Sequence, residues 1–169
     1  MSVFVCSDLH LGHKNIAKFR HFVSSCEGNT SLIVSDWRQH INKRDVVYVL
    51  GDAAFDQNGL DILATLPGRK ILIKGNHDDI VTTYAQSQVF EEIHGMLKYK
   101  GMWLTHCPIH PDEMRKCKKN VHGHVHSKSI MKRSWCGVKI LDPQYVNACV
   151  DVVYPKYGRI FITLDELRG

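Results

Sequence analysis

The chain has 169 residues, a length typical of one domain that buries its own core, so we expect a single domain over residues 1–169. Its residues are 44% hydrophobic and 23% charged, and no apolar run approaches the length of about 18 residues that a membrane span requires, so we expect neither a transmembrane helix nor a signal peptide. Lys and Arg exceed Asp and Glu by five, which is compatible with an anionic substrate but too little to indicate nucleic-acid binding.

The predicted elements are short apolar strands and helices, separated by polar corners that contain glycine. Runs rich in Val, Ile and Leu that are too short for helices predict strands buried on both faces. Ile33, Trp37 and Ile41 recur every four positions and predict a helix, for which Asn29 or Thr30 is available as a cap. In chain order the predicted elements are strand Val3–Cys6, helix Ser31–Lys43, strand Val46–Leu50, helix Leu60–Leu66, strand Ile71–Ile73, helix Ile80–Gln88, the hairpin of Met96–Tyr99 with Met102–Thr105, and the strand pair Val146–Val153 with Arg159–Thr163.

This order of elements predicts an α/β domain with a mixed sheet or two packed sheets. The six cysteines are scattered and form no CxxC pair, which favours reduced thiols over a disulfide framework. We therefore expect a cytoplasmic protein.

Polar, chemically active side chains directly follow the predicted strands. In α/β sheets the carboxyl ends of strands converge where ligands bind, so these side chains can meet although they span 119 positions. The motifs are Asp8 and His10 after the first strand, Gly51 and Asp52 after the second, Gly75 to Asp78 after the third, Thr105 and His106 at the end of the hairpin, and Gly123, His124 and His126 at a later corner.

Such a cluster combines two carboxylates, an amide and several imidazoles. Burying Asp8 beside Asp52 is unfavourable unless cations are present, because like charges oppose each other's ionisation. Mixed imidazole and carboxylate donors suit Mn, Fe, Zn, Co or Ni, with manganese our first choice, whereas calcium prefers oxygen ligands. A carboxylate can bridge two ions, and paired ions in hydrolases lie roughly 3.5–4 Å apart around one attacking hydroxide.

The ordered motifs Asp-x-His, Gly-Asp, Gly-Asn-His-Asp, Thr-His and Gly-His-x-His resemble those of the calcineurin-like metallophosphoesterase superfamily. The resemblance runs from Asp8 to His126, and the ending 147–152 is similar to that of small bacterial and phage members. It implies that the fold is a four-layer α/β/β/α sandwich of two mixed sheets. It also implies that the protein acts in a bacterial cytosol or a phage-infected host. It also implies two divalent metal ions, with these roles by position: Asp8, His10 and His126 on the first metal, Asn76, His106 and His124 on the second, Asp52 bridging both, and His77 facing the substrate as general acid or phosphate stabiliser.

One departure from the superfamily lies after Asp52. Phosphoprotein phosphatases continue with Gly-Asp-x-x-Asp-Arg-Gly, whereas this chain has Phe55, Asp56 and Gln57 at the corresponding places and lacks the arginine. This difference argues against a protein phosphatase. The displaced Asp56 is a candidate partner for His77.

Two residues are candidates for substrate binding. His13 either contacts the substrate or a carboxylate that supports a metal ligand, or it caps a helix that starts near Lys14. Lys128 belongs to a basic segment from Arg115 to Arg133, which brackets the last histidines and is either a solvated surface or a substrate groove. Asp78 is expected to cap the following helix, with ordering of the loop around His77 as the alternative.

The function predicted from the sequence is metal-dependent hydrolysis of a phosphodiester in a nucleotide or nucleic acid. A nucleotide phosphomonoesterase is the alternative within enzymes. A metal-bearing interaction scaffold without catalysis is the alternative outside them. No ligand position is missing, which favours the enzyme.

Overall fold

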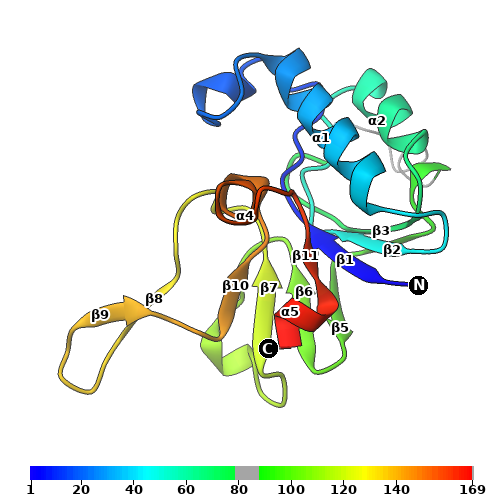
Figure 1. Cartoon of the computed structure of the whole chain (residues 1–169). Coiled ribbons are helices and arrows are strands. Elements are labelled where there is room, and N and C mark those ends of the chain that lie inside the picture. The colour runs from blue at the N-terminus through cyan, green and yellow to red at the C-terminus, as the bar shows by residue number, and fades with distance from the viewer. Residues whose placement is uncertain (79–87, 169) are drawn as a thin grey trace.

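Two mixed β-sheets pack face to face in the computed structural model, which describes residues 1–78 and 88–168 (Figure 1). The first sheet has the strand order β11-β1-β2-β3-β4, in which β11 alone runs antiparallel to its neighbour. Its strands are β1 (Val3–Cys6), β2 (Val46–Val49), β3 (Arg69–Ile73), β4 (Glu92–His94) and β11 (Ile162–Thr163).

The second sheet has the order β10-β7-β6-β5, with β5 antiparallel to β6 and the others parallel. Its strands are β5 (Met96–Tyr99), β6 (Met102–Thr105), β7 (Lys119–His122) and β10 (Tyr145–Asn147). The predicted hairpin of β5 and β6 is confirmed. Lys100 and Gly101 both have positive φ at its turn, as a tight two-residue hairpin connection requires.

Two helices, α1 (Cys26–His40) and α2 (Gln57–Ala64), cover the outer face of the first sheet. The core between helices and sheet includes Trp37 and Phe161, both fully buried, whose rings meet edge to face at 5.1 Å. A second core fills the space between the sheets and includes Tyr48 and Leu104.

The fourth layer of the α/β/β/α sandwich is thin. The segment 107–117, with the short 3₁₀ turn η2 (Pro111–Glu113), is hydrogen-bonded to the second sheet: Trp103 donates to the carbonyl of Glu113 at 3.1 Å, and Tyr145 to that of Ile109 at 2.7 Å. The fold is thus the sandwich of two mixed sheets expected from the sequence.

The first helix begins earlier than the sequence indicated. Ser25 caps α1 by accepting a hydrogen bond from the amide of Gly28 at 3.0 Å, so the helix starts at Cys26 and ends at His40. Asn29, expected as a cap, is buried inside the first turns and donates instead to the carbonyl of Leu9 at 3.0 Å. The predicted helix Ile80–Gln88 lies, except for its last residue, outside the described residues.

The strand pair predicted for Val146–Val153 and Arg159–Thr163 is wrong. Residues Val150–Tyr157 form a helix, α4, which Gly158 ends in the left-handed conformation, and β11 pairs with β1 instead. Val150 and Val153 are both fully buried at helical spacing. Packing therefore overrides the strand propensity of a valine-rich run. The C-terminal helix α5 (Leu164–Arg168) follows β11.

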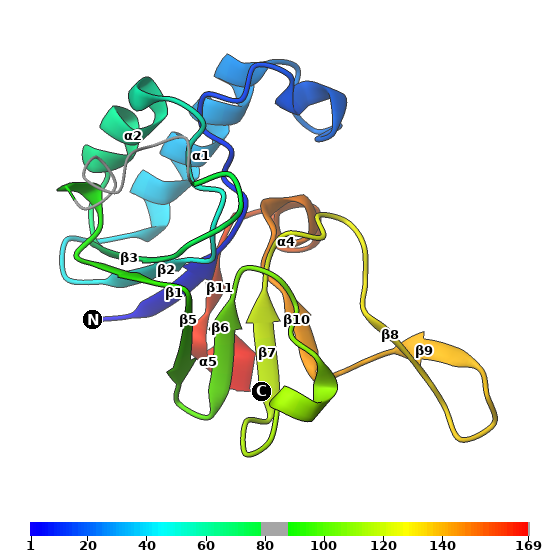
Figure 2. The same cartoon turned by 180° about the vertical axis from the view of Figure 1, so that it is seen from behind.

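A two-stranded hairpin of β8 (Met131–Arg133) and β9 (Lys139–Leu141) extends away from both sheets, as the two opposite views show (Figures 1 and 2). We call residues 128–144 the hairpin arm. Among the described residues, no helix is long and apolar enough to cross a membrane.

Candidate metal centre

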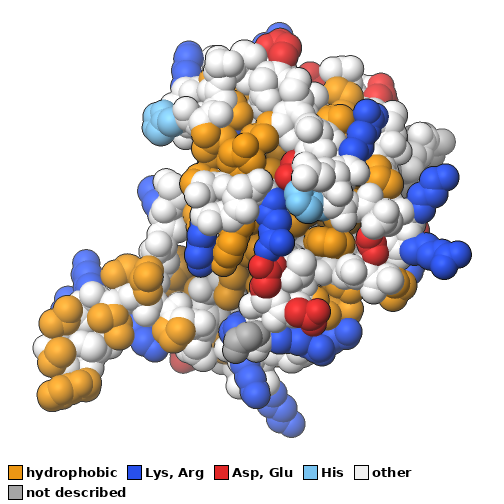
Figure 3. Space-filling view, in the orientation of Figure 1, with side chains coloured by type: hydrophobic (Ala, Val, Ile, Leu, Met, Phe, Trp, Pro, Cys, Tyr) orange, Lys and Arg blue, Asp and Glu red, His pale blue; other side chains and the backbone are white. Residues whose placement is uncertain are grey.

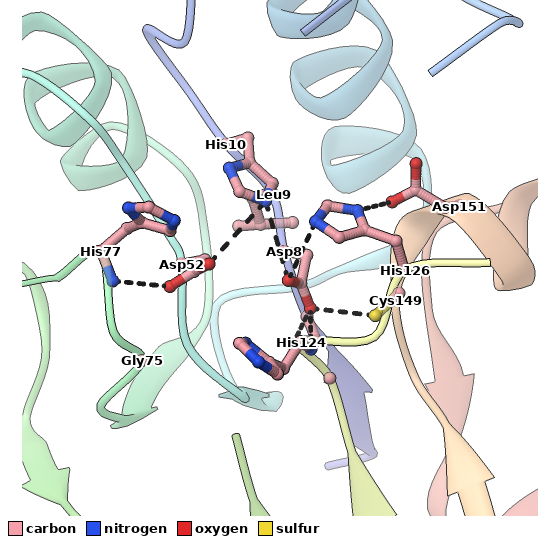
Figure 4. A network of polar contacts seen from close by, with 12 residues as sticks. Asp8, Leu9, His10, Asp52, Gly75, His77, His124, His126, Cys149 and Asp151 are labelled. Carbon is pink, nitrogen blue, oxygen red and sulfur yellow. Dashed lines mark hydrogen bonds and ion pairs between the residues drawn. The ribbon is translucent and has the colours of Figure 1, made fainter. Parts of the chain in front are cut away.

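The predicted motifs meet where the parallel strands of both sheets end. Asp8, Asp52, Asn76, His106 and His124 each lie within three residues of the end of β1, β2, β3, β6 and β7, respectively. The loops are joined across the two sheets, because the amide of His124 donates to a carboxylate oxygen of Asp8 at 3.0 Å. Figure 4 shows the side chains of Asp8, Asp52 and His124 converging on a common space.

The backbone at this edge takes an unusual conformation. Asp8, His10, Asp52, His124 and His126 have φ angles of 58°, 51°, 52°, 69° and 48°. Positive φ is uncommon for residues other than glycine, although Asp and His tolerate it better than most. Such conformations cluster at functional sites, where the surrounding structure holds them.

One group of donors surrounds an unpartnered carboxylate oxygen. Oδ1 of Asp8 lies 3.7 Å from Nε2 of His10 and 3.9 Å from Nε2 of His126, too far for hydrogen bonds. Both Asp8 Oδ1 and His10 Nε2 are buried, with no hydrogen-bond partner among the described residues. Buried polar atoms normally have partners, so their arrangement around one point fits a cation.

A second group consists of Asn76, His106 and His124. Oδ1 of Asn76 lies 2.9 Å from Nε2 of His106 and 3.0 Å from Nδ1 of His124. The sulfur of Cys107 also lies within 4.8 Å of donor atoms of both histidines, which the sequence did not indicate.

Asp52 lies between the two groups. Its Oδ1 is 3.6 Å from Nε2 of His106, and its Oδ2 is 3.9 Å from Nε2 of His10. Each carboxylate oxygen therefore faces a different group, the geometry that a bridging ligand requires. These donors fit two transition-metal ions.

The second oxygen of Asp8 is fixed by the protein. Oδ2 accepts hydrogen bonds from the hydroxyl of Ser7 at 2.6 Å and the thiol of Cys149 at 3.0 Å. Burial alone raises the pKa of Asp8, but the neighbouring His10 and these hydrogen bonds hold that pKa well below its usual range. The carboxylate is thus ionised, with one oxygen held and the other left to bind.

Asp151 and Arg20 orient His126 from behind. Oδ2 of Asp151 lies 3.0 Å from Nδ1 of His126, which turns Nε2 of that ring towards Asp8 (Figure 4). The same oxygen accepts from Nη2 of Arg20 at 2.9 Å, and Nη2 also donates to the backbone carbonyl of Asp8 at 2.7 Å. Burial raises the pKa of Asp151, but His126 and Arg20 outweigh it and lower that pKa to about 2.

Sequence reasoning missed Arg20, which belongs to no motif and is 1% exposed. A fully buried basic residue indicates a role in orienting a ligand. The sequence does not show that an arginine outside any motif is buried. Asp151 lies in the chain ending that resembled phage relatives, which was its only signal.

Asp78 orders two loops of the site. Its carboxylate accepts hydrogen bonds from the amides of Gly75 at 2.7 Å, Asp52 at 3.0 Å and Ala53 at 3.0 Å. Burial raises its pKa. These contacts support the alternative role, ordering the loop around His77, whereas the helix that Asp78 was expected to cap lies outside the described residues.

His77 lies at the rim of the site. Its amide donates to Oδ1 of Asp52 at 3.0 Å, and its ring lies 4.8 Å from that of Phe55 and 6.2 Å from that of His10. Asp56, considered as its partner, caps α2 instead by accepting from the amide of Gly59 at 2.8 Å.

His13 packs against the same aromatic ring. Its imidazole lies 4.5 Å from the ring of Phe55 and 5.7 Å from that of His10, and burial lowers its pKa. The capping role considered for His13 is wrong, because the first turn, η1 (Ile16–Lys18), begins after Asn15.

The basic segment from Arg115 to Arg133 does not form one surface. Lys119 opens β7 at the end opposite the metal centre, whereas Lys132 and Arg133 lie on the hairpin arm. Lys128 is exposed and lies two residues beyond His126. It is therefore the basic residue of this segment that is nearest along the chain to a candidate metal ligand.

Together, fold and site define a class, the metal-dependent phosphoesterases built on a two-sheet α/β sandwich. The chain belongs to the calcineurin-like phosphoesterase family, whose model matches residues 1–111. The Gene 66 protein of Mycobacterium phage D29 is 38% identical over 203 residues, covering 99% of this chain and 94% of that protein. An uncharacterized protein of Methanocaldococcus jannaschii is 28% identical, covering 98% and 97%.

Two solved structures resemble the fold. A protein of unknown function from Aquifex aeolicus has a TM-score of 0.73 at 26% identity, with 99% of this chain and 97% of that chain covered. The nuclease MPE of Pseudomonas putida has a TM-score of 0.51 at 18% identity, with 73% and 60% covered.

Proposed function

We propose that this chain is a two-metal phosphodiesterase that acts on a phosphodiester of a nucleotide or nucleic acid. The observation that carries the proposal is the position of Asp52, whose two oxygens face two separate donor groups. Asp8, His10 and His126 would hold one cation and Asn76, His106 and His124 the other, with manganese the first candidate. When bound, such a pair activates a water molecule and neutralises charge on the phosphoryl oxygens.

The protein's own contribution begins with rigid positioning. Asp8 and Asp52 are 0% and 2% exposed, and each has an oxygen held by the protein's own hydrogen-bond donors. The donor atoms are therefore arranged before any ligand binds, which reduces the reorganisation that catalysis requires.

His77 would serve the leaving group. Its backbone is tied to Asp52, so its half-buried ring stays beside Phe55 at the rim of the centre. A positioned imidazole that donates a proton to a departing alkoxide accelerates a reaction typically 10²–10⁴-fold.

An open site favours a diester, which carries substituents on both sides of phosphorus. Asn76 and His124 are exposed, so the centre faces solvent. A groove of about 380 Å³ adjoins it and is lined by Asn76, His106 and Lys74. It offers room for a second substituent of the phosphodiester.

The test uses bis-nitrophenyl and mono-nitrophenyl phosphate with and without added manganese. We expect hydrolysis of the diester that requires manganese, abolished by Asp52→Asn and unchanged by His110→Ala, a control at an exposed histidine. Preference for the monoester would favour the nucleotide monoesterase. No hydrolysis despite two bound metals would favour the interaction scaffold.

The role of His77 is tested with two leaving groups. His77→Ala should lose much activity on a dinucleotide, whose alkoxide needs a proton, and less on bis-nitrophenyl phosphate, whose leaving group is already a stable anion. Loss of a metal from the variant would identify His77 as a ligand instead. Equal losses on both substrates would indicate charge stabilisation at phosphorus.

A further inference from the structure

The hairpin arm exposes apolar side chains that a free surface seldom carries together. Trp135 is 99% exposed at the tip, and Leu141 and Val138 are 64% and 59% exposed. Figure 3 shows hydrophobic side chains over much of the arm, interspersed with basic ones. Contiguous exposed apolar residues on a projecting element indicate an interaction site.

The charges of the arm identify the kind of partner. Arg133 pairs directly with Lys139 across the two strands, and like charges in that position are destabilising. Asp142 is the arm's single acidic residue and lies 3.6 Å from Lys132 on the neighbouring strand. Arg133 and Lys139 thus form a cationic pair beside the tip that an anionic partner would stabilise.

The register of the hairpin combines this charge with apolar surface. Met131 pairs with Leu141 and Arg133 with Lys139, and alternate cross-strand pairs share one face of a two-stranded sheet. The face that presents both cations therefore also presents Met131 and Leu141, and Trp135 follows in the turn that joins the two strands.

We propose that the hairpin arm binds single-stranded nucleic acid, an inference that rests on the proposed phosphodiesterase function. Trp135 stacks on an unpaired base, and Arg133 and Lys139 contact phosphates. This combination of an aromatic platform and a basic surface is how proteins grip single strands without reading their sequence.

The base of the arm is joined to the metal centre. The side-chain Nδ2 of Asn147 donates to the backbone carbonyls of His126 at 2.6 Å and Lys128 at 3.1 Å, which fixes the arm to the loop that carries His126. A strand held by the arm is therefore led towards the donor groups.

The reach of the arm bounds the length of substrate that extends from the centre to the tip. From Lys128 to Trp135 the chain advances seven residues, at most about 23 Å at 3.3 Å per residue, because only Met131–Arg133 is strand. A stacked strand advances about 3.4 Å per nucleotide, so up to about seven nucleotides separate the centre from the tip. Substrates too short to reach the tip gain no binding affinity from Trp135.

The experiment measures binding of metal-loaded protein to fluorescent, hydrolysis-resistant phosphorothioate 12-mers of DNA and RNA, and to matching trimers. Trp135→Ala should weaken 12-mer binding by roughly 5- to 150-fold, the worth of one stacked base. Trimer binding should not change, and Trp135→Phe should restore most of the lost affinity.

Paired charge variants test the basic side chains. Arg133→Gln with Lys139→Gln should reduce the slope of log affinity against log salt by about 1.4, because two phosphate contacts are lost. The control, Lys116→Gln with Lys118→Gln, removes equal charge near the start of β7 and should leave the slope unchanged.

Three outcomes would overturn the proposal. The first is an unchanged affinity of Trp135→Ala for the 12-mer. The second is a change of oligomeric state in Trp135→Ala, which would identify the arm as an interface between copies of the chain. The third is binding to anionic vesicles, in place of oligonucleotides, that depends on Trp135. Turnover of bis-nitrophenyl phosphate reports separately on the proposed function, since that ester cannot reach the arm. Its retention in Trp135→Ala is expected.

Discussion

The ion pair of Arg20 and Asp151 provides the sharpest test of how the centre is built. The side chains of Arg20 and Asp151 are 0% and 6% exposed, and their closest atoms are 2.9 Å apart. Asp151→Ala leaves the guanidinium buried with neutral acceptors alone. Breaking a buried pair in this way costs about 3–5 kcal/mol. For a chain of this length each kcal/mol lowers Tm by roughly 2–4 °C, so Tm should fall by about 6–20 °C.

The assay is thermal unfolding in EDTA, so that metal binding does not contribute. The control is Glu91→Ala, which removes a pair with Arg69 whose side chains are 48% and 49% exposed. Such surface pairs contribute about 0–1 kcal/mol, so the control should lose no more than about 4 °C. An equal loss of Tm in the two variants would refute the reasoning. Should the alanine variant fail to fold, Asp151→Asn should lie between it and the unmodified chain.

The same variant also separates folding from metal binding. Asp151 orients His126, and loss of such a partner typically lowers metal affinity 10–100-fold. Titration of folded Asp151→Ala with manganese should show this loss at one of two sites. Unchanged manganese affinity at both sites would mean that the contact of Asp151 with His126 does not position His126 as a metal ligand.

Three further predictions follow from the site and the arm. Saturating manganese, at about 100 times its Kd, should stabilise the chain by about 2.7 kcal/mol for each site filled and raise Tm by roughly 5–11 °C per site in calorimetry, an effect that Asp52→Asn should largely remove. Gly123→Ala should reduce metal content in elemental analysis, because its methyl group would overlap Asp8, whereas Gly95→Ala, with nothing within 4 Å, should not. Cys136 should be the first thiol alkylated by iodoacetamide as pH rises, since its hydrogen bond with the neighbouring Ser134 lowers the pKa of this exposed thiol. Mass spectrometry showing another cysteine reacting first would contradict this.

Most of the donor positions were predictable because Asp8, Asp52, Asn76 and His106 follow strands that their apolar runs identify, whereas β7, which precedes His124, was not predicted. Val46–Val49 is buried throughout, and its apolar run leads directly to Asp52. Once the strands are parallel, their ends share an edge, and the meeting of Asp52 with His10 follows.

Other features depend on contacts that no local pattern encodes. Arg20 meets Asp151 across 131 positions, and neither residue belongs to a recurring spacing. The helix α4 contains three valines, whose strand preference is outweighed because Val150 and Val153 enter two different cores. The start of α1 was misplaced because Ser25 precedes the periodic residues that marked the helix.

The left-handed loops also bear on how this chain could change through descent. Such a backbone conformation costs an ordinary side chain about 1–2 kcal/mol, and glycine almost nothing. Five positions at one edge carry Asp or His where the backbone conformation by itself favours glycine. A lineage that abandoned the chemistry would therefore relieve backbone strain by drifting to glycine there, well before its strands altered. Erosion of function in this fold should begin in these loops and leave the sandwich intact.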